Sequence, residues 1–359
     1  MTMHIVGLET ATPKWRYTQR ECLQALAGSD LFRRLSARSQ VLLKRILGNG
    51  RSGITTRNLA LDPLDEFAQF DPDSLHQRFQ RHAPMLACQA AAGALANARV
   101  DPQEVDAVIV STCTGYLCPG LSTYVVERLP LRADVLALDL VGQGCGAAIP
   151  NLRTGETLIS GDSGCQTVLS VCVEICSAAF YLDDDPGVLV SACLFGDGAA
   201  AAVLRDSAVP GQRNVRWESC HSVLAPEHRD QLRFDQCRGM LRNVLTQPVP
   251  QIAARYADEL LSSALTATGL TRKDIGGWIW HTGGREVLNA LAQRLILTEA
   301  DLRWSREVLS EYGNMSSPSV LFVLQRALNG HAPSGLWWIA AFGAGFSSYG
   351  ALLNVGAPS

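Results

Sequence analysis

Residues 142–150 read Gly-Gln-Gly-Cys-Gly-Ala-Ala-Ile-Pro, and residues 312–318 read Tyr-Gly-Asn-Met-Ser-Ser-Pro. In each stretch a glycine precedes one polar residue, Cys145 or Asn314, and small or apolar residues follow. This pattern predicts a tight turn that leads into a buried helix. Cys145 and Asn314 lie 169 positions apart, which makes the two stretches candidates for equivalent sites in a duplicated chain.

Two further pairs of segments repeat along the chain. Residues 94–115 and 264–284 align without a gap at an offset of 170, and His281 lies at the end of the second apolar segment. The loops Leu-Phe-Gly-Asp-Gly (194–198) and Ala-Phe-Gly-Ala-Gly (341–345) fall near the end of each half. Three repeated pairs in the same order predict an internal duplication.

The duplication divides the chain into two predicted halves. The N-terminal half, residues 1–215, carries Cys145. The C-terminal half, residues 216–359, carries His281 and Asn314. Equivalent loops of the two halves would then have diverged to supply different reactive groups to one site.

Apolar segments alternate with amphipathic ones along the chain. The apolar segments predict strands that are covered on both faces, at residues 3–7, 107–111, 135–139, 167–173, 199–204, 278–281 and 336–342. The amphipathic segments predict helices at residues 19–27, 83–98, 252–268, 287–295 and 317–328. This alternation predicts an α/β fold with mixed sheets between layers of helices. Residues 28–82 and 205–250 show no clear pattern.

The chain has 359 residues, of which 47% are hydrophobic and 18% are charged, and this composition is typical of a globular protein with a large buried core. A net charge of −3 gives no reason to expect nucleic acid or an anionic membrane as a partner. No apolar run is long enough to span a bilayer, and the N-terminus does not read as a signal peptide. The 11 cysteines include no CxxC pair, so we expect free thiols, no zinc site and a cytoplasmic location.

Cys145, His281 and Asn314 are the candidate catalytic residues. A helix N-terminus lowers the pKa of a thiol, which makes Cys145 a candidate nucleophile as well as a candidate buried structural cysteine. His281 alone would suggest a capped core histidine, but a Cys–His pair is the standard way to form a thiolate near neutral pH. Asn314 suits an oxyanion hole, although an asparagine after a glycine is often only a helix N-cap.

Two further features leave alternatives open. Phe195, in the first Phe-Gly loop, could wall the active site or could be an ordinary core aromatic residue. The basic residues at 44–57, which include Lys44, Arg45 and Arg51, could bind the phosphates of a nucleotide-like carrier or could form a solvated basic face. The sequence favours neither alternative.

These motifs resemble the thiolase superfamily and, within it, the type III polyketide synthases, the chalcone-synthase-like enzymes. The strongest match is Glu-Tyr-Gly-Asn-Met-Ser-Ser-Pro-Ser-Val-Leu-Phe-Val-Leu (311–324). Gln-Gly-Cys (143–145), Val-Glu-Ile (173–175), Leu-Phe-Gly-Asp-Gly (194–198) and His-Thr-Gly-Gly (281–284) match in order and spacing. The resemblance covers nearly the whole chain and implies a duplicated αβαβα layered sandwich with two mixed sheets.

The resemblance also implies roles for particular residues. Cys145 would carry the growing chain as a thioester, while His281 and Asn314 would promote decarboxylation of malonyl-CoA and stabilise the resulting enolate. Phe195 would be a gatekeeper between the CoA tunnel and the cavity. The other implied residues line the substrate cavity (Cys113, Cys118, Cys176, Ala179 and Ser316) or bind CoA (Lys44, Arg45 and Arg51).

The chain departs from the plant enzymes of this family in several places. The second gatekeeper phenylalanine should lie near residues 240–244, which contain no phenylalanine, and the closing loop reads Gly-Ala-Gly (343–345) in place of Gly-Pro-Gly. The spacing of the basic CoA residues differs by a two-residue insertion. These departures suggest a bacterial-type enzyme with a different cavity. The family dimerises, and the loop around Cys118 would reach into the partner's cavity.

The implied reaction is a decarboxylative Claisen condensation of malonyl-CoA onto an acyl-CoA starter, repeated and followed by cyclisation to an aromatic or pyrone product. We expect no metal or organic cofactor, since the CoA thioesters are the substrates. The main alternative is a chain-initiating ketoacyl-ACP synthase, which would use malonyl-ACP and take an acyl carrier protein as a partner. A papain-like protease is less favoured because Cys145 lies mid-chain, and retention of all three catalytic positions argues against a non-enzymatic scaffold.

Overall fold

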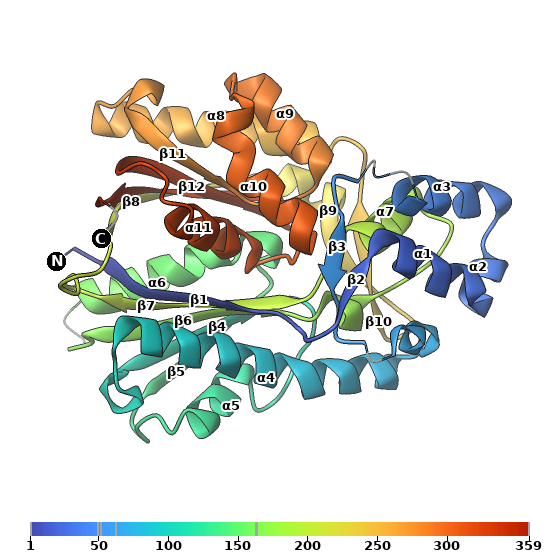
Figure 1. The fold of residues 1–359 in the computed structure, drawn as a ribbon, viewed down its shortest axis with the longest axis horizontal. Helices are drawn as coiled ribbons and strands as arrows, with labels where there is room; N and C mark the ends of the chain where they lie inside the picture. Colours follow the sequence, from blue (N-terminus) through green and yellow to red (C-terminus); the bar gives the residue numbers. More distant parts are fainter. Residues whose placement is uncertain (1, 49, 51, 62, 162–163, 358–359) are drawn as a thin grey trace.

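A computed structural model describes residues 2–48, 50, 52–61, 63–161 and 164–357 (Figure 1). The strands are β1 (His4–Ala11), β2 (Arg16–Thr18), β3 (Thr56–Asn58), β4 (Ala107–Thr112), β5 (Leu136–Val141), β6 (Thr167–Glu174), β7 (Gly198–Arg205), β8 (Val215–Leu224), β9 (Leu232–Cys237), β10 (Met240–Leu245), β11 (Ile275–Trp280), β12 (Gly335–Gly343) and β13 (Ser347–Val355). The α-helices are α1 (Gln19–Gly28), α2 (Asp30–Arg34), α3 (Ala37–Gly48), α4 (Pro72–Ala98), α5 (Leu121–Arg128), α6 (Ala148–Ser160), α7 (Pro186–Leu194), α8 (Val249–Thr268), α9 (Arg285–Leu295), α10 (Glu299–Tyr312) and α11 (Ser319–Asn329). The 3-10 helices are η1 (Leu64–Ala68), η2 (Pro102–Glu104), η3 (Gly144–Gly146), η4 (Cys176–Ala179), η5 (Pro226–Gln231) and η6 (Arg272–Asp274).

The main sheet has two parts with the same strand order and direction. The first part runs β4-β6-β7-β1, with β5 added at its edge, and the second runs β11-β12-β13-β8. Each part has one parallel pair of strands, followed by two antiparallel pairs. The parts join where His4 of β1 pairs with Arg216 of β8. This repeat of topology is what an internally duplicated chain requires.

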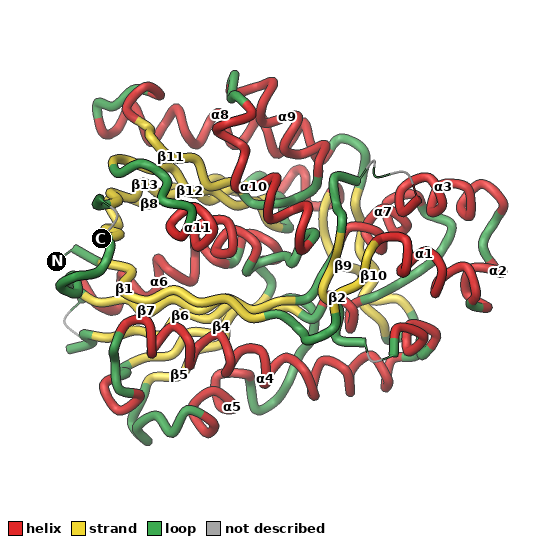
Figure 2. The backbone as a smooth tube through the Cα atoms, viewed as in Figure 1, coloured by secondary structure: helices red, strands yellow, loops and turns green. Residues whose placement is uncertain are grey.

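The helices form three layers around the two parts of the sheet. In Figures 1 and 2, α6 and α11 lie between the parts, α4 and α5 cover the outer face of the first part, and α8 and α9 cover the second. The contacts agree: α6 and α11 pack on strands of both parts, whereas α4 packs on β1, β6 and β7 and α8 packs on β8 and β13. The fold is therefore the layered αβαβα sandwich that the resemblance implied.

Burial explains why the middle strands and helices are so apolar. Every residue of β4 and of β6 is buried, because helices cover both faces of these parallel strands. Helix α11 in the middle layer is buried on several sides, with Val320, Leu321, Phe322, Val323 and Leu324 all in the core. On the outer side, alanines of α4 allow a close approach to β1, where a Cβ on Gly7 would lie 2.3 Å from the Ala94 carbonyl oxygen.

Two segments that lacked a clear sequence pattern do contain regular structure. Residues 28–82 include α2, α3, β3 and the start of α4. In α3 the buried stripe is only Ser39, Leu43 and Leu47, so its helical period is masked by the basic residues around it. Residues 205–250 include β8, β9 and β10. These strands are half-exposed, and their polar outward side chains hid the strand pattern.

Among the described strands, β9 and β10 form a hairpin that pairs with neither part of the main sheet. Its two-residue turn has positive φ at both Arg238 (52°) and Gly239 (79°), the conformation that suits the twist of a tight hairpin. The hairpin packs against α7 and η4. Among the helices of the described ranges, none has the length and apolar character needed to cross a bilayer.

Candidate active site

Cys145 lies in the turn that connects β5 to α6, as the sequence indicated. The turn uses positive φ at Gly142 (81°) and Gly144 (58°). Cys145 itself is in η3, immediately before α6. A Cβ on Gly146 would lie 2.9 Å from the Tyr349 ring and 3.1 Å from the Gly343 backbone nitrogen. The glycines therefore allow this turn to pack directly against the loop between β12 and β13.

Burial governs the ionisation of the Cys145 thiol. Its pKa is raised to about 12, chiefly because burial disfavours the thiolate, and the nearby charge of Glu174 acts in the same direction. A hydrogen bond from Ser316 Oγ to Cys145 Sγ, 3.2 Å long, lowers the pKa only in part. The expectation that the helix N-terminus would lower this pKa was therefore wrong for the free enzyme, since burial by distant segments outweighs the local effect.

Asn314 is held by its backbone and by its side-chain oxygen. Its backbone N–H donates to the Leu194 carbonyl (2.9 Å), and its carbonyl accepts from Gly196 N–H (2.9 Å). Its Oδ1 accepts a hydrogen bond from the backbone N–H of Ser316 (2.8 Å). With Oδ1 occupied, the Nδ2 group of this 4% exposed residue is the one that can donate to a ligand.

Ser316 connects the Asn314 segment to two thiols. It has φ of 61°, the left-handed conformation that non-glycine residues seldom adopt. Its Oγ contacts Cys145 Sγ (3.2 Å) and Cys113 Sγ (3.4 Å), while its N–H fixes Asn314. A strained backbone held at such a junction is typical of functional sites.

His281 follows β11 and is buried, with 2% of its surface exposed. Its backbone N–H donates to the Ala340 carbonyl (2.9 Å), and its Nδ1 has no hydrogen-bond partner among the described residues. Burial lowers the pKa of the imidazole to about 4, so the ring is neutral at physiological pH. The described residues show no hydrogen bond between His281 and Cys145; the neighbouring Thr282 instead contacts the Gly313 carbonyl (3.4 Å) next to Asn314.

The resemblance implies a step in which malonyl-CoA loses carbon dioxide, and we expect the rate of that step not to follow the ordinary titration of histidine. Because the pKa of His281 is lowered from 6.5 to about 4, the ring stays neutral throughout the range from about pH 5 to pH 8. The rate of acetyl-CoA formation from malonyl-CoA should therefore be flat there and fall only at more acidic pH. A His281→Gln variant, which keeps an amide donor, should retain more of this rate than His281→Ala. A rate that halves near pH 6.5 in the wild type would contradict the prediction.

Glu174, at the end of β6, links the two halves of the site. Its buried carboxylate accepts hydrogen bonds from the Cys113 N–H (3.0 Å) and from Thr114 Oγ1 (2.8 Å) in the first half. It also accepts one from Ser317 Oγ (2.6 Å) in the second half. Burial raises the pKa of Glu174, and these donors oppose that rise. The sequence motif Val-Glu-Ile contained Glu174, but no role had been assigned to it.

A cavity opens beside Cys145, and most of the predicted lining residues are in its walls. Those that line it are Cys113, Cys145, Cys176, Ala179, Phe195 and Ser316. His281 and Asn314 are not among the described residues that line this cavity. Cys118 is exposed and lies outside this cavity of its own chain, so its reach into a partner stays a prediction.

Of the three predicted CoA-binding residues, two lie in the described part of the structure. Lys44 and Arg45 lie exposed on α3. Arg51 lies outside the described residues. Helix α3 packs on α7 through Leu43 and Leu47, and α7 ends at the cavity residue Phe195. The basic side chains are therefore separated from the cavity wall by one helix.

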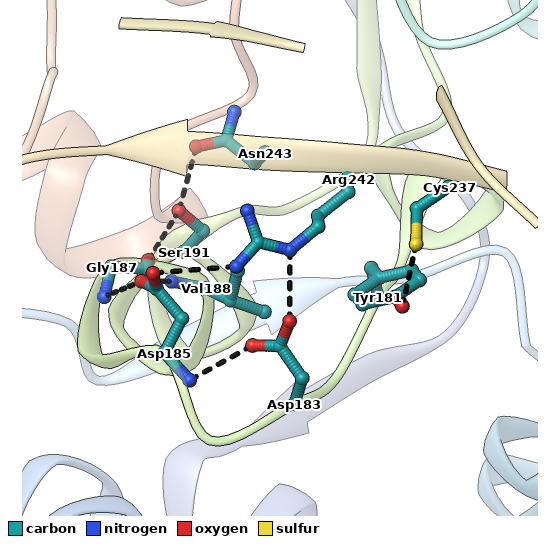
Figure 3. A network of polar contacts seen from close by, with 9 residues as sticks. All are labelled: Tyr181, Asp183, Asp185, Gly187, Val188, Ser191, Cys237, Arg242 and Asn243. Atoms are coloured by element: carbon teal, nitrogen blue, oxygen red, sulfur yellow. Dashed lines mark hydrogen bonds and ion pairs between the residues drawn. The ribbon is translucent and has the colours of Figure 1, made fainter. Parts of the chain in front are cut away.

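The β9–β10 hairpin supplies a wall that sequence reasoning missed. Phe234 of β9 and Asn243 of β10 are cross-strand partners, and both line the cavity. The sequence lacks a phenylalanine at 240–244, and the structure places an aromatic ring on the neighbouring strand instead. Ser191 Oγ donates to Asn243 Oδ1 (2.9 Å), which fixes the asparagine against α7 (Figure 3). The opposing strand could not be identified before the hairpin register was known.

Ion pairs hold this wall in place (Figure 3). Arg242 Nε donates to Asp183 Oδ2 (2.8 Å), and its Nη2 lies 3.3 Å from Asp185 Oδ2. Asp185 also caps α7 through the N–H of Gly187 (2.8 Å). Tyr181 Oη and Cys237 Sγ are 3.1 Å apart. Arg242 thus fastens the hairpin to the start of the helix that carries Ser191.

Comparison with known proteins agrees with this architecture. Residues 11–237 match the family described as FAE1/type III polyketide synthase-like protein, and residues 225–355 match the C-terminal domain of chalcone and stilbene synthases. A 3,5-dihydroxyphenylacetyl-CoA synthase of Streptomyces toyocaensis is 31% identical, over 90% of this chain and 82% of the relative. A 1,3,6,8-tetrahydroxynaphthalene synthase of Streptomyces peucetius subsp. caesius is 32% identical, over 98% and 92%. The crystal structure of PKS-I from the brown alga Ectocarpus siliculosus has a TM-score of 0.90 at 26% identity and covers 98% of both chains.

The chain therefore belongs to the type III polyketide synthase family. It is an enzyme of the acyltransferase class with the thiolase-like layered fold. The comparisons support this class over the ketoacyl-ACP synthase alternative. In the described part of the chain, no group of three or more His, Cys, Asp or Glu side chains is placed to hold a metal ion.

Proposed function

We propose that the chain extends an acyl starter, held as a thioester on Cys145, by decarboxylative condensation with malonyl-CoA. One observation carries this proposal: Ser316 contacts the Cys145 thiol through its side chain and orients the Asn314 amide through its backbone N–H. A nucleophile and an oxyanion donor are thereby tied to one residue at a cavity. The proposed reaction needs both groups, the nucleophile to hold the starter as a thioester and the donor to stabilise the enolate oxygen.

In the proposed first half-reaction, Cys145 Sγ attacks the carbonyl carbon of an acyl-CoA starter. The thiol proton passes to the neutral imidazole of His281, and CoA leaves as a thiol when that proton is returned to its sulfur. The imidazole charge is transient, because the buried site disfavours imidazolium. The starter is then bound to Cys145 as a thioester.

In the proposed second half-reaction, the malonyl C–C bond breaks and carbon dioxide leaves. The electron pair forms an enolate whose oxygen is stabilised by Asn314 Nδ2 and by an N–H of neutral His281. The enolate carbon then attacks the Cys145 thioester, a new C–C bond forms, and the Cys145 sulfur is released. The elongated acyl-CoA can reload Cys145. These steps use CoA thioesters as substrates, and the proposal assigns no metal or organic cofactor to them.

We propose that repeated extension and ring closure give a product of the aromatic or pyrone class. The relatives' names support this assignment, since they include 3,5-dihydroxyphenylacetyl-CoA, 1,3,6,8-tetrahydroxynaphthalene and α-pyrone synthesis. Phe195 is proposed as the gate between CoA and the cavity, because it ends α7 and lines the cavity beside Cys145. The thiols of Cys113, Cys145 and Cys176, none of which is in a disulfide, support a reducing compartment, and we propose the cytoplasm.

The test of this function is product mass spectrometry with malonyl-CoA and a panel of acyl-CoA starters. Products at starter mass plus several acetate-derived units would support the proposal and identify the starter and the number of extensions together. A protein that extends no acyl-CoA but does extend with malonyl-ACP would overturn it. The Cys145→Ala variant is the control for products that form without the enzyme.

Lys44 and Arg45 of α3 are proposed to bind the phosphates of CoA. Both are exposed, and the helix beneath them leads to the cavity. Replacing both with glutamate should raise the KM for malonyl-CoA about tenfold or more, because two favourable charge contacts become unfavourable. The KM for the malonyl thioester of N-acetylcysteamine, which lacks these phosphates, should change little. Arg128→Glu on α5 alters the charge elsewhere and is the control. Equal effects on both thioesters would remove these residues from the carrier site.

We propose that two copies of the chain pair through β5. This strand lies at the edge of the sheet, and Leu136 and Val141 expose 43% and 57% of their surface. An exposed apolar edge strand is suited to pairing with another strand. Replacing both residues with lysine should convert a dimer into a monomer of 38.7 kDa in light scattering. Ile296→Lys, at an apolar position that is 86% exposed elsewhere, should leave the dimer intact. A wild-type monomer would refute the proposal.

A further inference from the structure

The proposed gate and the proposed oxyanion donor belong to one backbone unit. Phe195 and Asn314 form a parallel β-bridge, closed by hydrogen bonds from Asn314 N–H to the Leu194 carbonyl and from Gly196 N–H to the Asn314 carbonyl, both 2.9 Å long. The two segments come from different halves of the chain. Their close packing leaves no room at Gly196, where a Cβ would lie 2.4 Å from the Tyr312 carbonyl oxygen. A displacement of one segment must therefore displace the other or break the bridge.

Arg57 of β3 binds this unit from inside the protein. It is 2% exposed and lines the cavity. Its Nη1 donates to the Phe195 carbonyl (2.8 Å) and to the Ala192 carbonyl (2.9 Å), at the C-terminal end of α7, where a cation is favourable. Its aliphatic part packs on the residue before Asn314, since a Cβ on Gly313 would lie 3.2 Å from Arg57 Cγ. One side chain thus contacts Phe195 and the residue that precedes Asn314.

Strand β3 is itself fixed on both sides of Arg57. Thr55 N–H donates to the Ser310 carbonyl (2.7 Å), and Thr56 Oγ1 donates to the Glu311 carbonyl (2.7 Å) at the end of α10. On the other side, the Asn58 carbonyl accepts from Asp197 N–H (2.8 Å), just beyond the gate. Arg57 therefore extends from a strand that is anchored to both segments it contacts.

We propose that Arg57 is a positioning residue that holds Phe195 and Asn314 in register, so that malonyl decarboxylation occurs only while the gate is in place. The proposal rests on the proposed function, because it assigns roles to the gate and to the oxyanion donor. Arg57 donates none of its described hydrogen bonds to a side chain. It acts through the backbone that places Asn314 Nδ2.

The inference predicts that the two half-reactions respond differently to Arg57. In an Arg57→Lys variant the shorter side chain does not bring its ammonium to the place where Nη1 binds both carbonyls, so the bridge should loosen. Acetyl-CoA formation from malonyl-CoA should fall by about tenfold or more, because small displacements of catalytic groups are costly. Acylation of Cys145 by a starter, followed by intact-protein mass spectrometry, should change little, since Cys145 lies on a different turn. Arg57→Gln, which buries no unpaired charge, should show the same split.

Arg213→Lys is the matched control. Arg213 also donates to backbone carbonyls, those of Gly356 (3.0 Å) and Leu328 (3.3 Å), but at the opposite end of α11 from the site. Both half-reactions should keep their wild-type rates in Arg213→Lys, even if its melting temperature is as low as that of Arg57→Lys. Equal decarboxylation in the Arg57 and Arg213 variants would overturn the inference, as would a parallel loss of both half-reactions. A wild-type enzyme that forms no acetyl-CoA would refute the proposed function instead.

Hydrogen exchange in the wild type gives a second test that needs no folded variant. The amides of Gly196 and Asn314 close the same bridge, so they should show the same protection factor, which is the intrinsic exchange rate of an amide divided by its observed rate. Protection factors that differ by more than about tenfold would mean that the gate and the oxyanion segment open independently, and would overturn the inference. This measurement does not depend on catalysis, so it separates the coupling from the proposed reaction.

Discussion

Replacing Cys145 with alanine is expected to abolish condensation and to leave the fold intact. The side chain is small, its neighbours are glycine and alanine, and Ser316 Oγ retains Cys113 as a partner (3.4 Å) when Sγ is removed. Without a thiol no acyl-enzyme can form, so extended products should disappear altogether. The formation of acetyl-CoA from malonyl-CoA should persist, because it depends on Asn314 and His281.

The measurement combines product mass spectrometry with a thermal melt. Cys88→Ala, which removes a buried thiol from α4 outside the cavity, is the matched control and should retain condensation. Extended products from Cys145→Ala would exclude the thiol as the nucleophile. Unfolding of this variant alone would show instead that Cys145 is needed for structure.

Asn314→Ala should lower malonyl-CoA decarboxylation by about 10²-fold or more, the usual cost of losing one oxyanion donor. The backbone bridge to residues 194–196 does not involve the side chain and should remain. Acylation of Cys145 should therefore be affected much less than decarboxylation. The two rates are separated by following acetyl-CoA formation and the mass of the acyl-enzyme.

Asn314→Asp sharpens this experiment. The carboxylate keeps an oxygen that can accept from the Ser316 N–H (2.8 Å in the wild type), but it offers no Nδ2 donor and places a negative charge beside the enolate. It should be at least as slow as Asn314→Ala. Wild-type decarboxylation in either variant would refute the oxyanion role of Asn314.

The sequence was most informative where the signal is local. Cys145 and Asn314 could be singled out because glycines and small residues surround each of them, and the alternation of apolar and amphipathic segments predicted the α/β fold. Even so, the direction of the Cys145 pKa shift was wrong. The effect of a helix N-terminus can be read from neighbouring residues, whereas burial depends on segments brought in from elsewhere in the chain.

Arg57, Phe234 and Asn243 show why the rest could not be predicted. Arg57 lies among basic residues that look alike in sequence, and its partners Ala192 and Phe195 are 135 and 138 positions away. Phe234 becomes a cavity residue only through its pairing with Asn243. Such roles follow from tertiary contacts, which neither periodicity nor local motifs record.

Shaping the cavity and holding the nucleophile are separate tasks in this protein, and the β9–β10 hairpin takes part in the first. It walls the cavity, yet within the described chain it is hydrogen-bonded as a strand pair only to itself, while Cys145 rests on the main sheet. Substitutions in the hairpin can therefore remodel the space offered to the growing chain without disturbing the strands beneath the nucleophile. The hairpin is thus a part of the cavity wall whose side chains can change while the strands of the main sheet keep their pairing.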